Sequence, residues 1–128
     1  MAIRIVRLGS PRQPGEGLRV GTVRRPPRGV RKDDYAAQDW YDVWYPELAP
    51  SADTLALGRR ADNTPAWAGF LKRYRAEMAA PAASRTLDLL AALSHRADFS
   101  VGCYCADEAH CHRSVLRALL AQRGALLR

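Results

Sequence analysis

Apolar and polar residues follow two different periods along this chain, and the changes of period predict the order of its elements. Residues 3–8 (IRIVRL) and 18–23 (LRVGTV) alternate at every second position, which is typical of short strands. Residues 9–17 between them are rich in proline and glycine and predict a loop rather than a helix. If the two strands are parallel, that loop itself must cross from one to the other.

Aromatic side chains dominate residues 39–45 (DWYDVWY), where alternation predicts a third strand ended by Pro46. Large aromatic residues most often build a core, so we expect this segment to pack inside the protein. Ser51 has the residue type and position of an N-cap, and it predicts a short helix that reaches about residue 57.

Two longer helices are predicted from apolar stripes at helical spacing. Thr64 is the expected N-cap of the first, with Pro65 at the first helical position, where its missing amide hydrogen costs nothing. The stripe of this helix runs from Trp67 to Met78 and ends before a proline. Ser84 is expected to start the second helix, which continues to about residue 96.

The C-terminal part predicts a buried strand followed by one more helix. Residues 99–104 (FSVGCY) have the composition of a strand inside a sheet. An amphipathic pattern then begins at Cys111 or His112 and ends near Gly124, whose residue type suits a C-terminal cap. The order of elements predicts an α/β fold: a single-domain sandwich over residues 1–128, with a small mixed, mainly parallel sheet and flanking helices.

Composition agrees with a globular protein and narrows the classes of partner. Hydrophobic residues make up 48% of the 128 positions and charged residues 26%. No apolar run reaches the roughly 18 residues of a membrane span, and the N-terminal segment does not resemble a signal peptide, so we expect a cytoplasmic protein with no membrane partner. The net charge of +7 favours phosphates or nucleic acid, but its arginines are scattered and accompany no nucleic-acid-binding motif.

All three cysteines fall within residues 103–111 (CYCADEAHC), beside His110, His112 and Arg113. An odd number of clustered cysteines in a reducing compartment argues against a disulfide framework and favours thiol chemistry or metal binding. The segment also joins a predicted strand to a predicted helix. α/β proteins place ligands at such junctions, because the helix offers free amides and the positive end of its dipole.

Thiol chemistry is the first interpretation of this cluster. A cysteine in the first turn of a helix, beside a histidine and an arginine, would have a lowered pKa, as a nucleophilic or redox thiol requires. We therefore expect Cys111 or Cys105 to be the reactive thiol, with His112 or His110 as its proton-transfer partner. Cys103 lies deeper in the predicted strand and is expected to belong to the core.

Metal binding is the second interpretation, and it uses the same atoms. Cys105, Cys111 and either His110 or His112, of which we take His110, could hold zinc or iron, with Cys103 as a third sulfur ligand if it reaches the loop. The spacing C-x-C-x5-C-H departs from the usual pair of C-x-x-C knuckles, so the sequence alone does not choose between a metal centre and a free thiol.

A basic loop in the first half of the chain supplies candidate ligand contacts. Residues 24–32 (RRPPRGVRK) contain two prolines that fix the chain, and Gly29 permits an unusual backbone dihedral. Arginine forks match the geometry of carboxylates and phosphates, so we expect Arg25 and Arg28 to hold a small anionic ligand together with Arg113. A plain solvated surface loop is the alternative.

Two stretches of the chain resemble the family catalogued as domain of unknown function 488 (DUF488), small bacterial and archaeal proteins. They are CYCADEAHCHRSVL at the C-terminal cluster, and RPPRGVRK followed by WYPELAPS in the first half. The resemblance implies a compact α/β domain and no established reaction. It also implies that Arg28 and Gly29 act jointly with the Cys-His-Arg segment.

Three functions are therefore expected in order. The first is binding of an anionic ligand between residues 24–31 and 105–113, with thiol-based chemistry. The second is a zinc or iron module, and the third is non-specific binding of nucleic acid.

Overall fold

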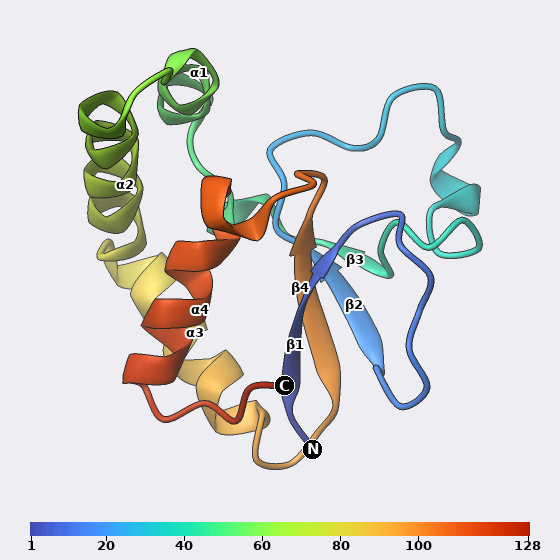
Figure 1. Cartoon of the computed structure of the whole chain (residues 1–128). Coiled ribbons are helices and arrows are strands. Elements are labelled where there is room, and N and C mark those ends of the chain that lie inside the picture. Colours follow the sequence, from blue (N-terminus) through green and yellow to red (C-terminus); the bar gives the residue numbers. More distant parts are fainter.

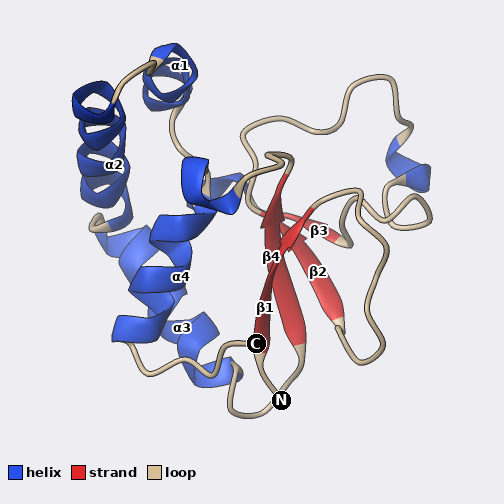
Figure 2. Ribbon diagram, viewed as in Figure 1, coloured by secondary structure: helices blue, strands red, loops and turns tan.

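The computed structural model describes all residues from 1 to 128 and consists of a four-stranded sheet with its helices on one side and long loops on the other (Figures 1 and 2). The strands are β1 (Ile3–Arg7), β2 (Leu18–Gly21), β3 (Val43–Trp44) and β4 (Phe99–Cys103), in the spatial order β1-β4-β2-β3. Every ladder is parallel. The predicted α/β class is confirmed, but the sheet, which was expected to be mixed, is wholly parallel.

β4 lies between β1 and β2, and all of its residues are buried. Ile3 pairs with Phe99 and Arg7 with Cys103, so β1 and β4 end at the same level. The hydrogen-bonded contact continues one residue past the strands, because the Leu8 amide donates to the Cys103 carbonyl at 2.8 Å. The carboxyl ends of the strands therefore meet at one edge of the sheet, as parallel strands require.

The helices are α1 (Ala52–Arg60), α2 (Thr64–Met78), α3 (Pro81–Leu93) and α4 (Arg113–Gln122), with 3₁₀ turns at Lys32–Asp34, Pro46–Leu48 and Glu108–His110. None of these helices has the length and apolar character needed to cross a membrane. The apolar faces of α2, α3 and α4 cover one face of the sheet, where side chains such as Val101, Tyr74 and Leu116 form the main core. α1 packs on α2, with Gly58 against the ring of Phe70.

The helix starts confirm one predicted cap and correct two others. The Ser51 hydroxyl accepts a hydrogen bond from the Thr54 amide, so Ser51 caps α1 as expected. The cap of α2 is Asn63 rather than Thr64, because the Asn63 side-chain oxygen accepts from the Ala66 amide at 2.9 Å. α3 begins at Pro81 rather than Ser84, since proline fits a first helical turn that needs no amide donor.

The predicted third strand over residues 39–45 is reduced to the two residues of β3. Asp39 has φ of +61°, a left-handed conformation that turns the chain away from the sheet. Tyr41 instead packs its ring against Gly21 of β2, where a Cβ atom would collide with the ring. Gly21 therefore marks a close approach to a side chain.

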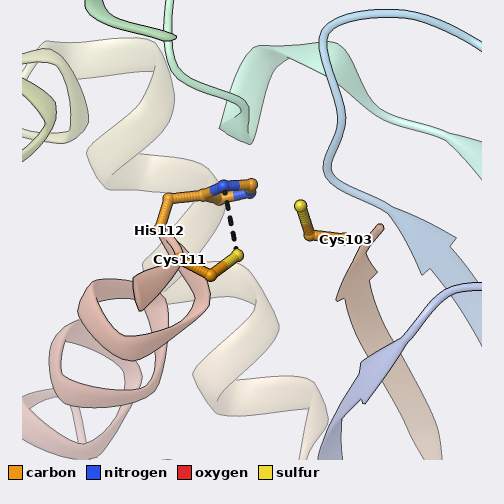
Figure 3. A group of neighbouring side chains, drawn as sticks. All are labelled: Cys103, Cys111 and His112. Atoms are coloured by element: carbon orange, nitrogen blue, oxygen red, sulfur yellow. Dashed lines mark hydrogen bonds between the residues drawn. The ribbon is translucent and has the colours of Figure 1, made fainter. Parts of the chain in front are cut away.

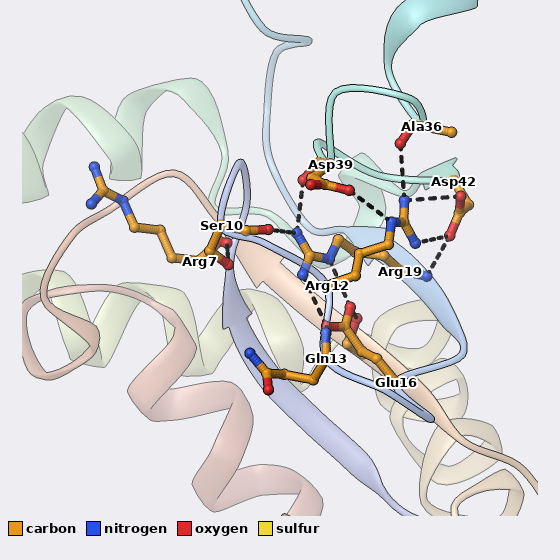
Figure 4. A network of polar contacts seen from close by, with 10 residues as sticks. Arg7, Ser10, Arg12, Gln13, Glu16, Arg19, Ala36, Asp39 and Asp42 are labelled. Atoms are coloured by element: carbon orange, nitrogen blue, oxygen red, sulfur yellow. Dashed lines mark hydrogen bonds and ion pairs between the residues drawn. The ribbon is translucent and has the colours of Figure 1, made fainter.

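A buried ion pair fastens the loop that crosses from β1 to β2 on the face opposite the helices (Figure 4). Arg19 donates to Glu16 at 2.7 Å and 2.9 Å, and Ser100 of β4 donates to the same carboxylate at 2.9 Å. Arg19 also donates to the Ser10 and Asp39 carbonyls at 2.8 Å and 2.7 Å. The loop at residues 9–17 thus makes the crossover itself.

Burial opposes the ionisation of Glu16, yet hydrogen bonds from Arg19, the Gln13 amide and Ser100 lower its pKa to about 2. The pair is almost fully enclosed, with 0% of the Arg19 side chain and 1% of the Glu16 side chain exposed. Because each partner is a buried charge, loss of either leaves the other uncompensated.

Candidate functional site

An open cleft of about 1580 Å³ lies at the carboxyl ends of the strands, between the basic loop and the loop that bears the cysteines. No acidic side chain lines it. Five arginines do, from β1, the basic loop and α1: Arg7, Arg24, Arg25, Arg28 and Arg59. The cleft therefore presents positive charge with no carboxylate among its walls, which favours an anionic ligand.

All three cysteines and all three tryptophans of the chain line the same cleft. The tryptophans come from different segments: Trp40 from the loop before β3, Trp44 from β3 and Trp67 from α2. The walls thus combine aromatic rings with arginines around the thiols.

The thiols converge where β4 ends and α4 begins. The Cys103 thiol donates to Cys105 Sγ at 3.7 Å, and Cys111 Sγ lies 3.8 Å from Nδ1 of His112. The donor atoms of Cys103, Cys111 and His112 all lie within 4.8 Å of one another. Figure 3 shows the three side chains facing one another across the junction. Cys103 and Cys111 are buried, whereas Cys105 is exposed.

Cys103 is in the core as expected, but its sulfur also joins the cluster. Alternation along β4 points Cys103 to the same face as Phe99 and Val101, toward the helices. Because Cys103 is the last residue of β4, its side chain meets the start of α4 rather than the middle of the core.

His112 is fixed by the residue that follows β2. Its Nε2 atom lies 2.7 Å from the Thr22 carbonyl oxygen, and a carbonyl can only accept a hydrogen bond. Nε2 therefore carries the ring proton of the neutral imidazole, and Nδ1 keeps its lone pair toward Cys111. His112 is thus placed to take a proton from Cys111 or to act as a metal ligand through Nδ1.

The thiols differ in acidity because they hydrogen-bond to one another. Donation by Cys103, then by Cys111, and the positive charge of Arg113 lower the pKa of Cys105. Donation to Cys105 and Cys111, followed by burial, raises the pKa of Cys103. The pKa of Cys111 is lowered, first by the Cys103 thiol and further by His112. Among the exposed positions of the cluster, the surroundings therefore favour deprotonation of Cys105.

Arg113, predicted to hold an anion, does not line the cleft. It is 3% exposed, and its Nη2 donates to the Cys105 carbonyl at 2.6 Å. Arg113 therefore positions the cysteine loop and contributes its charge to Cys105 from inside the protein. Its Nε atom is buried with no hydrogen-bond partner.

His110 is not grouped with the thiols and instead stacks on an aromatic ring. Its exposed ring stacks on Trp67 with 4.2 Å between centroids, and Trp67 in turn stacks on Phe70 at 4.5 Å. The structure groups Cys103, Cys111 and His112 as potential metal ligands, and of the predicted set of Cys105, Cys111 and His110 this group contains Cys111.

The basic loop faces the cysteine loop and is tied to it. The Tyr104 hydroxyl donates to the Arg25 carbonyl at 2.8 Å, and Arg24 donates to the Pro46, Ala49 and Pro50 carbonyls. Arg24 thus has a structural role. Arg25 and Arg28 line the cleft and form no ion pair within the chain.

Gly29, expected to act in binding, has φ of +71° and lies outside the cleft, so its role is to turn the loop. Two residues that do contribute to the site, Arg59 and Thr22, carry no signal in the sequence analysis. Arg59 of α1 does line the cleft, although it lies outside every motif considered above. Thr22 acts only through its backbone carbonyl, which no residue type encodes.

The fold and the site define a class of protein. It is a small α/β protein whose thiols gather where β4 ends and α4 begins, beside an arginine-lined cleft. The family model described as the active DUF488-N3 subclade matches residues 3–124, and the chain therefore belongs to the DUF488 family. This confirms the family expected from the Cys-His-Arg and basic-loop motifs. No curated protein and no solved structure matches the chain.

Proposed function

We propose that the protein is a thiol-dependent enzyme that acts on an anionic ligand bound in the cleft, with Cys105 as its reactive thiolate. The observation that carries the proposal is the position of the exposed, acidified Cys105 in a cleft lined by arginines and by no carboxylate. The description of the matching subclade as active supports an enzymatic role.

Each side chain of the site has a separate role in this proposal. Arg25, Arg28 and Arg59 hold the anionic group, since arginine forks match phosphate and carboxylate oxygens. The Cys105 sulfur forms a bond to an electrophilic carbon or phosphorus atom of the ligand. The bond from that atom to its leaving group breaks, and the leaving group departs with the electron pair. Water then displaces the thiolate, which restores Cys105.

Cys111 and His112 are the proton-handling pair behind the nucleophile. Nδ1 of His112 lies beside the Cys111 sulfur and is the acceptor for the Cys111 proton during the reaction. Of the sequence expectations, Cys105 is preferred over Cys111 as the reactive thiol because Cys111 is only 2% exposed.

Alkylation tests the proposal. Iodoacetamide and iodoacetate both transfer a carbon to a thiolate with loss of iodide, but only iodoacetate carries a negative charge. We expect the alkylation of Cys105, followed by mass spectrometry of the peptide, to have a pH midpoint far below that of an ordinary cysteine. Two results together would exclude this function. They are a pH midpoint at the ordinary value, and a ratio of iodoacetate to iodoacetamide rates that is the same for Cys105 as for free cysteine.

A metal centre is a second candidate, favoured by the geometry of Cys103, Cys111 and His112. Two sulfurs and one nitrogen suit zinc or iron, and the hydrogen bond to Thr22 is the outer contact that orients a histidine ligand. Elemental analysis of untagged protein purified without chelator tests this candidate. One zinc or iron per chain, with thiols that become reactive only after chelation, would replace the free-thiolate function.

A further inference from the structure

We infer that the ligand of the cleft is a single-stranded nucleic acid, whose phosphates contact the arginines and of which one base stacks on His110. The inference rests on the proposed function in that it identifies the anionic ligand of the same cleft. It does not depend on which reaction Cys105 carries out.

The distribution of charge fits a chain of phosphates better than a single anion. The cleft arginines come from three separate segments, namely β1, the basic loop and α1. Arg25, Arg28 and Arg59 take part in none of the ion pairs of the protein. A strand that neutralises several separated arginines gains from counterion release at each contact.

The aromatic residues supply a platform for a base. Phe70, Trp67 and His110 form a continuous stack with interplanar angles of 21° and 20°. The stack ends at the exposed His110 ring, which has no aromatic partner beyond Trp67. A base placed on His110 extends the stack, and such stacking contributes about 1–3 kcal/mol per base without regard to sequence.

The size of the cleft favours a strand over a mononucleotide. Its volume of about 1580 Å³ exceeds the range of roughly 300–1,000 Å³ that small-molecule pockets usually span. A duplex does not fit the inference, because its bases are already stacked on one another and are not free to meet His110.

Tryptophan fluorescence of the intact protein provides the test, since every tryptophan of the chain lines the cleft. The probes are deoxyadenosine oligomers of about four and eight nucleotides, AMP, and inorganic polyphosphate matched in charge to the longer oligomer. We expect the longer oligomer to quench the fluorescence and to bind at least about tenfold more tightly than polyphosphate. Its affinity should fall steeply as salt is raised.

Matched variants separate the contacts. His110→Ala should weaken oligomer binding about tenfold, whereas His110→Phe, which keeps a flat ring and loses the ionisable nitrogens, should retain it. Arg28→Ala and Arg59→Ala should lower both the affinity and the salt dependence. Their controls are Arg31→Ala and Arg60→Ala, exposed neighbours that do not line the cleft. Thermal melting of each variant verifies the fold.

Each outcome of these measurements either supports or overturns the inference. Equal affinity for oligomer and polyphosphate would reduce the cleft to a general polyanion site and overturn it. AMP binding as tight as that of the oligomer would replace the strand with a nucleotide. Absence of quenching at low salt would overturn it outright. Cys105→Ser should bind the oligomer normally, so oligomer binding and the alkylation of Cys105 can fail independently.

Discussion

Nε2 of His112 donates a 2.7 Å hydrogen bond to the carbonyl oxygen of Thr22, and this contact determines which ring nitrogen faces the thiols. The two residues belong to opposite ends of the chain and meet because β2 and β4 are neighbours. The geometry of the sheet thereby fixes the tautomer of a side chain that belongs to the start of α4.

The first prediction concerns the tautomer of His112. In protein labelled with ¹⁵N at histidine, NMR at neutral pH should show the His112 proton on Nε2 and an unprotonated Nδ1. His112→Ala should raise the pKa of Cys111, which loses its basic neighbour, and should destabilise the fold by about 1–3 kcal/mol. A spectrum with the proton on Nδ1 would contradict the assigned role of His112.

The second prediction concerns the hydrogen bond from Cys103 to Cys105. Cys103→Ala should raise the pKa of Cys105, because the thiolate loses its principal donor. Cys103→Ser keeps a hydroxyl donor and should have a smaller effect. The pH profile of iodoacetamide alkylation measures both, and identical profiles for alanine, serine and wild type would show that Cys103 does not tune Cys105.

The third prediction concerns the charge of the basic loop. Arg25→Ala and Arg28→Ala should slow the alkylation of Cys105 by iodoacetate about tenfold, while iodoacetamide, which is neutral, reacts nearly as before. Arg31→Ala is the matched control, since Arg31 is an exposed arginine of the same loop outside the cleft. A parallel loss of both rates would indicate distortion of the site rather than loss of attraction for the anion.

The fourth prediction concerns the stability of the crossover loop. The folded pKa of Glu16, about 2, lies below its ordinary value of 4.5, so its ionisation stabilises the fold above pH 4.5. That stability decreases as the pH falls below 4.5 and is lost as the pH passes through about 2. Glu16→Gln should cost about 3 kcal/mol at neutral pH and flatten the acid dependence of urea unfolding in this window.

Glu47→Gln is the control for the crossover experiment, because Glu47 is exposed and forms no ion pair. An acid profile that is the same in Glu16→Gln and Glu47→Gln would contradict the role of the Arg19–Glu16 pair.

The sequence predicted the class of fold and the segments of the candidate site, because periodicity and residue chemistry are local properties. Residues 24–28 of the basic loop and residues between 103 and 112 do line one cleft, as their composition suggested. The pairing of Arg19 with Glu16 was missed because burial of a charge depends on which loop covers it. The left-handed Asp39 shortened the expected third strand; aspartate tolerates this conformation better than most residues, but its residue type does not require it.

The arrangement within the site was less accessible to sequence reasoning than its location. His110 and His112 are equivalent in the sequence, yet one stacks on Trp67 of α2 and the other binds Thr22 after β2. Their separate roles follow from long-range packing, which only the folded chain shows.

The central position of β4 has a consequence for how the protein folds. β1 pairs along its length only with β4, so its partner strand is synthesised only after the intervening residues 8–98. Assembly of the sheet depends on contacts between distant segments, which slows folding relative to a helical bundle of similar size. The sulfur cluster forms in the same late step, and until then its three thiols are open to oxidants and to stray metal ions.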